Sequence, residues 1–248
     1  MAEQVKFKAY GENAATFLIF QALAMKPGAL VSVLLSRLKR FGTGNPIERR
    51  DLDEVDVWLF PNFGKGHGFG EPDVLVLAGR LAFWIEIETT INCQSGVPAL
   101  RRSLLQLWRF RLFQDAIARP ARTVRESRRI VGVTLNNERE VRAAELRLRG
   151  HGALQRIRDR LRCAAGNDHY VLFTVNKPKG EGTGRRSYAQ VLYHETSHLG
   201  DGYPEHLPRL DPQRCWYAYW WDDLERKFNE ADPKLDLDQY YVRIKKTQ

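Results

Sequence analysis

The sequence predicts an α/β protein in which a mixed β-sheet is flanked by helices. Two apolar stretches separated by a short turn predict a β-hairpin over residues 74–88. Amphipathic helices are expected on either side of it, at 12–25 and 99–118, and a further strand at 169–175 follows a helix. Helices and strands that alternate after a hairpin favour a sheet with both antiparallel and parallel pairs.

The composition is that of a globular protein, and we expect it in the cytoplasm. Hydrophobic residues make up 43% of the 248 residues, enough for one large domain or a core with an added lobe. No apolar run approaches the ~20 residues of a membrane span, and the first ten residues lack the apolar centre of a signal peptide. The three cysteines form no Cys-x-x-Cys pair, which argues against a zinc ribbon.

The elements before the hairpin follow from periodicity and turn residues. A second helix is expected at 29–40, where a glycine-rich turn ends it, and a strand at 55–60. The loop at 61–70 is rich in glycine but lacks the Gly-Lys-Ser/Thr of a phosphate-binding loop. We interpret it as a flap beside a site, with Lys65 or His67 near the substrate, or as a plain solvated loop.

The hairpin brings acidic side chains together. Successive strand residues point to opposite faces, so Glu86 and Glu88 share one face while Ile85 and Ile87 share the other. Two acids side by side on an apolar strand are costly without a partner. A divalent cation is the expected partner, and Asp73, at the start of the preceding strand, is placed to join them. Oxygen ligands of this kind suit Mg²⁺ or Mn²⁺.

These residues resemble the motif of the PD-(D/E)xK nuclease superfamily: Pro72-Asp73 on one strand, then Glu86-Ile87-Glu88 on the next. The resemblance implies a restriction-endonuclease-like αβββαβ core and a metal held by Asp73, Glu86 and Glu88. Glu88 stands where most members carry lysine, although some type II restriction enzymes have Glu-x-Glu there. The task of positioning or deprotonating the attacking water then falls to Glu88 or to a second metal ion.

The resemblance also implies two further catalytic residues. An initial helix often contributes a glutamate to the metal site, and Glu12 matches that position; its alternative role is a favourable charge in the first helical turn. Members frequently carry a glutamine near the catalytic face of the helix after the hairpin, and Gln106 lies there. The alternative for Gln106 is an exposed polar residue.

Basic residues are concentrated just after the hairpin. Between positions 101 and 162 there are 17 arginines, no lysine and 6 acids, which gives this region a net charge of +11. The net charge of the whole chain is +9, so the rest of the chain is slightly acidic. Arginine binds phosphate oxygens with two parallel hydrogen bonds, which makes such a region the expected footprint of nucleic acid, and of DNA above all. Arg101, Arg102 and Arg109 are the residues that we expect to bind the nucleic acid. The alternative is a solvated helix face.

The rest of the chain predicts the last elements of the core and a C-terminal extension. A strand at 129–136, a helix at 137–162 with a break at 150–152, and the strand at 169–175 complete a core at 1–175. Residues 176–248 form a C-terminal extension packing on it, in which five aromatic residues cluster at positions 216–221. Such a cluster stacks on unpaired bases or packs in a core, and we favour packing.

A second motif competes with the first. His194-Glu195-Thr196-Ser197-His198 is a literal His-Glu-x-x-His, which on a helix binds zinc through the two histidines while the glutamate polarises a water. A glycine follows His198 by two residues, so the helix is short, and no recognised spacing selects Glu205 or His206 as a third ligand. This zinc site is the alternative to the carboxylate site.

The sequence therefore predicts a Mg²⁺- or Mn²⁺-dependent endonuclease. Two alternatives stay open: a zinc-dependent hydrolase or protease that uses the second motif, and a non-catalytic nucleic-acid-binding subunit on a degenerate nuclease fold. By analogy with small members of the superfamily, a place in a restriction or antiphage defence system, with a protein partner or as a homodimer, is expected, and no contact with a membrane.

Overall fold

The computed structural model describes residues 27–45, 54–59, 61, 71–88, 98–118, 152–174, 186–199, 201, 205, 207–219, 226 and 230. Within these ranges one mixed sheet of six strands forms the centre of the protein. The strands are β1 (Lys39–Arg40), β2 (Val55–Leu59), β3 (Val74–Ala78), β4 (Leu81–Glu88), β5 (Asp168–Thr174) and β6 (Cys215–Tyr219).

The strand order across the sheet is β1-β6-β5-β4-β3-β2. Strands β2, β3 and β4 pair antiparallel as a meander, β5 and β6 continue parallel to β4, and β1 closes the other edge antiparallel to β6. The predicted hairpin and the mixed α/β class are therefore confirmed.

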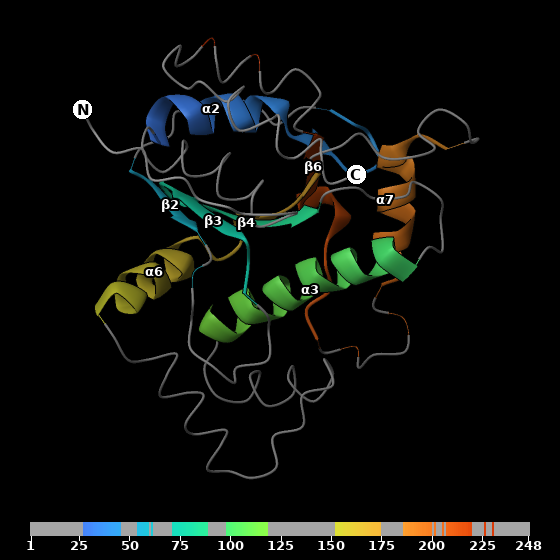
Figure 1. The fold of residues 1–248 in the computed structure, drawn as a ribbon. Coiled ribbons are helices and arrows are strands. Elements are labelled where there is room, and N and C mark those ends of the chain that lie inside the picture. The colour runs from blue at the N-terminus through green and yellow to red at the C-terminus, as the bar shows by residue number, and fades with distance from the viewer. Residues whose placement is uncertain are drawn as a thin grey trace, which may run out of the picture.

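Helices cover both faces of this sheet (Figure 1). They are α2 (Pro27–Arg37), α3 (Pro98–Ala118), α6 (Gly152–Cys163) and α7 (Tyr188–Ser197), with a 3₁₀ turn at Pro212–Arg214. Helix α2 packs on one face, and α3, α6 and α7 contribute to the core on the other. None of the helices in the described ranges is long and apolar enough to cross a membrane.

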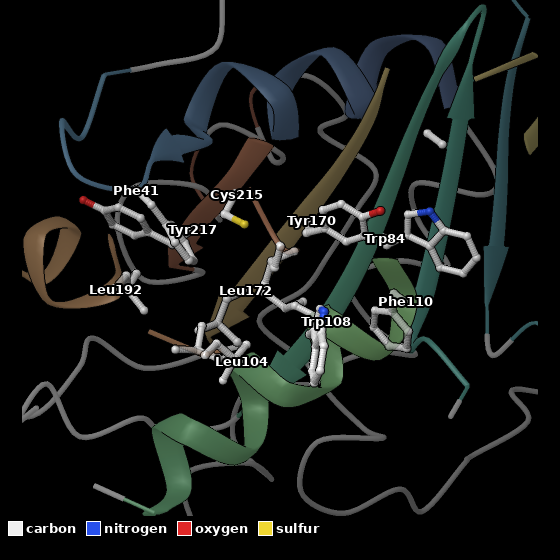
Figure 2. Packing of buried hydrophobic residues seen from close by; sticks show 14 of the residues in the cluster. Phe41, Trp84, Leu104, Trp108, Phe110, Tyr170, Leu172, Leu192, Cys215 and Tyr217 are labelled. Carbon is white, nitrogen blue, oxygen red and sulfur yellow. The ribbon is translucent and has the colours of Figure 1, made fainter. Parts of the chain in front are cut away.

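The two faces of β4 carry different side chains, as strand geometry requires. Phe83, Ile85 and Ile87 pack in the core under α2, while Trp84 packs in the core under α3. Figure 2 shows Trp84 beside Phe110 of α3, and their ring centroids are 5.7 Å apart. This packing holds α3 against the face of β4 that also carries Glu86 and Glu88.

One predicted boundary is wrong. The helix expected at 29–40 ends at Arg37, and Lys39–Arg40 form strand β1. The chain changes direction because β1 pairs with β6, which extends through the bond from the Phe41 N–H to the Cys215 carbonyl, 3.0 Å. Periodicity within the segment carries no information about this distant partner. The first helix at 12–25 and the strand at 129–136 lie outside the described residues, as do residues 137–151 of the helix expected at 137–162; the rest of that helix is α6.

The C-terminal part of the chain supplies a strand to the sheet. Strand β6 lies between β1 and β5, although it comes from the segment predicted as an extension. Trp216, Tyr217 and Tyr219 are buried on it, so the packing role favoured for these aromatic residues is confirmed. Trp220 and Trp221 lie outside the described residues.

Candidate active site

Asp73 lies just before β3, at the end of the hairpin where β4 carries Glu86 and Glu88. The last antiparallel pair of β3 and β4 joins Val74 to Ile85. The Asp73 Oδ2 atom accepts a hydrogen bond from the Ile87 N–H at 2.8 Å. The Asp73 side chain thus bonds to β4 beyond the last backbone pair of the two strands, at the residue between Glu86 and Glu88.

Glu86 and Glu88 lie on the face of β4 that is covered by α3. Both residues are half-buried, and they alternate with the fully buried Ile85 and Ile87 of the opposite face. The predicted sharing of one face by the two acids is confirmed. Asp73 is also half-buried, and its hydrogen bond to the Ile87 N–H puts it at the same end of the hairpin as Glu86 and Glu88.

Helix α3 contacts this end of the hairpin through Ser103. The Ser103 hydroxyl donates a hydrogen bond to Glu88 Oε1 at 2.6 Å, and Ser103 is 3% exposed. Sequence reasoning missed this residue. The available signal was its place on the apolar stripe of the helix, between the buried Leu100 and Leu107, where a hydroxyl needs a partner.

Gln106 lies one turn after Ser103 on the same helix and is half-buried. Its Oε1 atom accepts a hydrogen bond from Arg109 at 3.2 Å. Two of the predicted site residues are therefore in contact with each other. Arg101 and Arg102 are exposed in the turn that precedes Ser103.

Other arginines of the basic region stabilise the fold. Arg160 of α6 pairs with Asp56 of β2 and donates to the Glu54 carbonyl at 2.5 Å. Arg162 donates to the Ile117 carbonyl at 3.3 Å, which joins α6 to the end of α3. The excess of arginine after the hairpin is therefore partly structural, and the local charge overstates the surface available to phosphate.

The second motif lies on α7, a helix that begins at a capping box. The Ser187 hydroxyl accepts from the Gln190 N–H, and the Gln190 side chain accepts from the Ser187 N–H. The rings of His194 and His198 are one turn apart with centroids separated by 4.8 Å, and His198 Nδ1 lies 3.1 Å from the Asp201 carboxylate. The two histidines are thus brought together.

A third protein ligand does not join the histidines in the described part of the chain. Across the described ranges, no group of three or more His, Cys, Asp or Glu side chains is arranged to hold a metal ion. Glu205 is exposed, and His206 lies outside these ranges. A zinc site with three or four protein ligands is therefore not assembled by the residues described.

The same finding covers the predicted carboxylate site, because Asp73, Glu86 and Glu88 all lie in the described ranges. The three acids therefore do not form a group that could hold a metal ion through three protein ligands. Mg²⁺ keeps several waters and is usually bound through one or two carboxylates together with substrate phosphates. Glu12, Lys65 and His67, which the sequence also predicts near the site, lie outside the described residues.

Comparisons of the chain with protein-family models, with curated proteins and with solved structures gave no match.

Proposed function

We propose that this protein is a metal-dependent endonuclease that hydrolyses phosphodiester bonds, with DNA as its substrate. The observation that carries the proposal is the hydrogen bond from the Ile87 N–H to Asp73 Oδ2 at 2.8 Å, which attaches Asp73 to β4 between the positions of Glu86 and Glu88. The described elements are compatible with it, because β2, β3 and β4 are followed by α3, and later in the chain by α6 and by β5, which is parallel to β4. The resemblance to PD-(D/E)xK nucleases likewise implies a mixed sheet flanked by helices.

The residues have separate roles in this proposal. Asp73 and Glu86 hold Mg²⁺ or Mn²⁺, which when bound activates a water and offsets charge on the scissile phosphate. Glu88 occupies the position of the missing lysine and adds a second negative charge to the same face of β4. Gln106, which contacts Arg109 at 3.2 Å, lies one helical turn beyond the Ser103 that bonds to Glu88.

Nucleic acid binds through exposed arginines at the start of α3. Arg101 and Arg102 are exposed and directly precede Ser103, so phosphates that they contact lie beside the carboxylates. Arg160 and Arg162 are committed to contacts within the fold and have no part in this interface.

The activity is tested by incubating supercoiled plasmid, single-stranded DNA and RNA with the protein in Mg²⁺, Mn²⁺ or EDTA. We expect cleavage with either metal, none in EDTA, and none by Asp73→Asn. His194→Ala is the matched control, because His194 lies on α7 and belongs to the competing motif; it should cut like the wild type.

The outcomes separate the three candidate functions. Loss of cutting in His194→Ala but not in Asp73→Asn would transfer the chemistry to the histidine motif, and stoichiometric zinc in the purified protein would support that. Binding of DNA without cleavage under any metal would identify a non-catalytic subunit.

The interface is tested by the salt dependence of DNA binding. The slope of log K against log salt should become shallower by roughly one for each phosphate contact removed, as in Arg101→Gln or Arg102→Gln. Arg156→Gln is the control, because Arg156 is also exposed but lies on α6, which contacts the opposite end of α3. Equal slopes in all four proteins would contradict the proposed interface.

A further inference from the structure

Helix α7 carries two histidines that have no role in the proposed function. His194 and His198 lie one turn apart, and their ring centroids are separated by 4.8 Å at an interplanar angle of 73°. Zinc lies about 2.0–2.1 Å from the ligating nitrogen of an imidazole, so rings at this separation can share one ion. The pair therefore offers two nitrogen ligands from one helix.

The Asp201 carboxylate orients one of these ligands. Its Oδ2 atom lies 3.1 Å from His198 Nδ1, and the Asp201 N–H donates to the His198 carbonyl at 3.2 Å, so the backbone holds the carboxylate at the ring. An ionised carboxylate only accepts hydrogen bonds, so Nδ1 carries the proton and Nε2 keeps its lone pair for a metal. Carboxylates bonded in this way are common partners of histidines that bind zinc.

The helix that presents the histidines is held in place by the rest of the fold. Tyr188 and Leu192 of α7 are buried in the core, and the capping box at Ser187 fixes the first turn. Figure 1 shows α7 at one side of the fold. The His198 side chain is nevertheless 62% exposed and that of Asp201 73% exposed, so an ion reaches the site from solvent.

One copy of the chain leaves such an ion with an incomplete set of ligands. Within the part of the chain that the structure describes, no group of three or more His, Cys, Asp or Glu side chains could hold a metal ion. Two histidines are half of the four ligands of a closed zinc site. A symmetric dimer uses the same surface of both copies, so a second copy supplies the same two histidines again.

The surface around α7 suits contact between two copies. Residues 187–201 include two acids and no lysine or arginine, whereas the whole chain has a net charge of +9. Two chains that meet at α7 thus keep their arginine-rich regions out of the contact. Tyr193, which directly precedes His194, is 40% exposed and is the one exposed large hydrophobic side chain among the described residues. It offers apolar surface beside the histidines.

We propose that His194 and His198 form half of a zinc site that two copies of the chain complete, so that Zn²⁺ joins them in a dimer. Each copy supplies two imidazoles, and Asp201 is a positioning residue for His198. This inference goes beyond the proposed function and does not rest on it, because the carboxylates of the hairpin play no part in it. Imidazole ligands select zinc over Mg²⁺, which prefers oxygen.

The test follows the assembly of the full chain in sedimentation velocity and isothermal titration calorimetry. After treatment with EDTA and dialysis, the protein should be monomeric. Zn²⁺ should convert it to a dimer with one bound ion for every two chains, EDTA should reverse the change, and Mg²⁺ should not cause it. These measurements need no catalytic turnover, so they are independent of the outcome of the cleavage assay.

Variants then separate the ligands from their surroundings. His194→Ala and His198→Ala should each abolish the dimer, and Asp201→Asn should weaken zinc binding by about 10–100-fold without abolishing it. Glu205→Gln is the matched control, because it removes another exposed acid that follows α7, and it should bind zinc like the wild type.

Several results would overturn the inference. A wild-type assembly that does not change with zinc would do so, as would one ion bound per chain in a monomer or an unchanged dimer in both histidine variants. Loss of zinc binding in Glu205→Gln would show that a single chain supplies a third ligand, and a second copy would then not be needed.

Discussion

The Asp73 carboxylate accepts a hydrogen bond from the Ile87 N–H at 2.8 Å, which attaches the residue before β3 to the end of β4. The backbone bond gives Asp73 a structural role in addition to its place in the proposed metal site. The two roles depend on different properties of the side chain, because the hydrogen bond needs an acceptor oxygen while the metal needs a negative charge.

Asp73→Asn and Asp73→Ala should therefore separate stability from activity. Asparagine keeps an acceptor oxygen for the Ile87 N–H but loses the charge, so it should abolish cleavage with little change in the free energy of unfolding. Alanine removes both and should also cost about 1–2 kcal/mol of stability, because a half-buried N–H loses its partner. Urea denaturation and plasmid cleavage measure the two effects. Cleavage by Asp73→Asn at the wild-type rate would contradict the proposed role.

A cation that binds the carboxylates should stabilise the folded protein. At a free concentration ten times the dissociation constant, Mn²⁺ should add about 1.4 kcal/mol to the free energy of unfolding, since it binds only the folded state. The rise in melting temperature should disappear on addition of EDTA and be absent in Asp73→Asn. An equal rise in both proteins would place the cation elsewhere.

Gln114 supports the site from within the core. It is 1% exposed; its Oε1 accepts from the Trp84 indole at 3.2 Å and its Nε2 donates to the Leu161 carbonyl at 2.7 Å. Gln114→Leu leaves both groups buried without a partner, so we expect a loss of about 2–4 kcal/mol in urea denaturation. Gln190→Leu, at an exposed capping position, should cost about 1 kcal/mol or less. Equal losses would show that burial of the network is unimportant.

The face of the site was predictable from the sequence, because it depends on local geometry. Alternation along β4 fixes that Glu86 and Glu88 share a face, and a two-residue turn at Gly79-Arg80 fixes the register in which Val74 pairs with Ile85. The resemblance to the nuclease motif rests on these two acids and on Asp73.

The contacts between distant segments were not predictable in this way. Ser103 reaches Glu88 only because α3 folds back over β4, and β6 enters the sheet between β1 and β5, which come from far apart in the chain. Composition was a weaker guide still: Arg160 counts as one more positive charge in the sequence, but in the structure it joins α6 to β2. The number of arginines gives the charge of the region but does not show which arginines form ion pairs within the fold.

Gly42 should be intolerant of a side chain for two separable reasons. Its φ angle is +84°, and an added Cβ atom would lie 2.9 Å from Cδ2 of Tyr193. Gly166 has φ +87° but no atom within 4 Å of such a Cβ. Gly166→Ala should therefore cost only the backbone strain, about 1–2 kcal/mol, while Gly42→Ala should cost more. Chemical denaturation compares them, and Tyr193→Ala in the Gly42→Ala background should recover the difference. Equal costs would exclude the clash.

The pH dependence of stability should reveal two buried groups that are neighbours in the sheet. Tyr170 and Cys215 are paired in the register of β5 and β6, and burial raises the pKa of both well above its ordinary value, with the charge of Asp168 adding to the shift. In the unfolded chain these groups ionise from about pH 9 for cysteine and about pH 10 for tyrosine. In the folded protein they stay protonated to higher pH.

The contribution of Tyr170 and Cys215 to the free energy of unfolding is therefore fully present below about pH 9 and is lost as the pH rises. Above that value the folded state binds more protons than the unfolded state. Each group contributes a slope of up to about 1.4 kcal/mol per pH unit. Urea denaturation between pH 7 and 11 should show this decline, and Cys215→Ala should make it shallower, whereas Cys163→Ala, at an exposed position, should not. Tyr170→Phe should also flatten the decline, although it lowers stability at neutral pH because the bond from the Tyr170 hydroxyl to Asp168 at 2.6 Å is lost. An unchanged slope in both variants would mean that these groups ionise in the folded protein as they do in the unfolded chain.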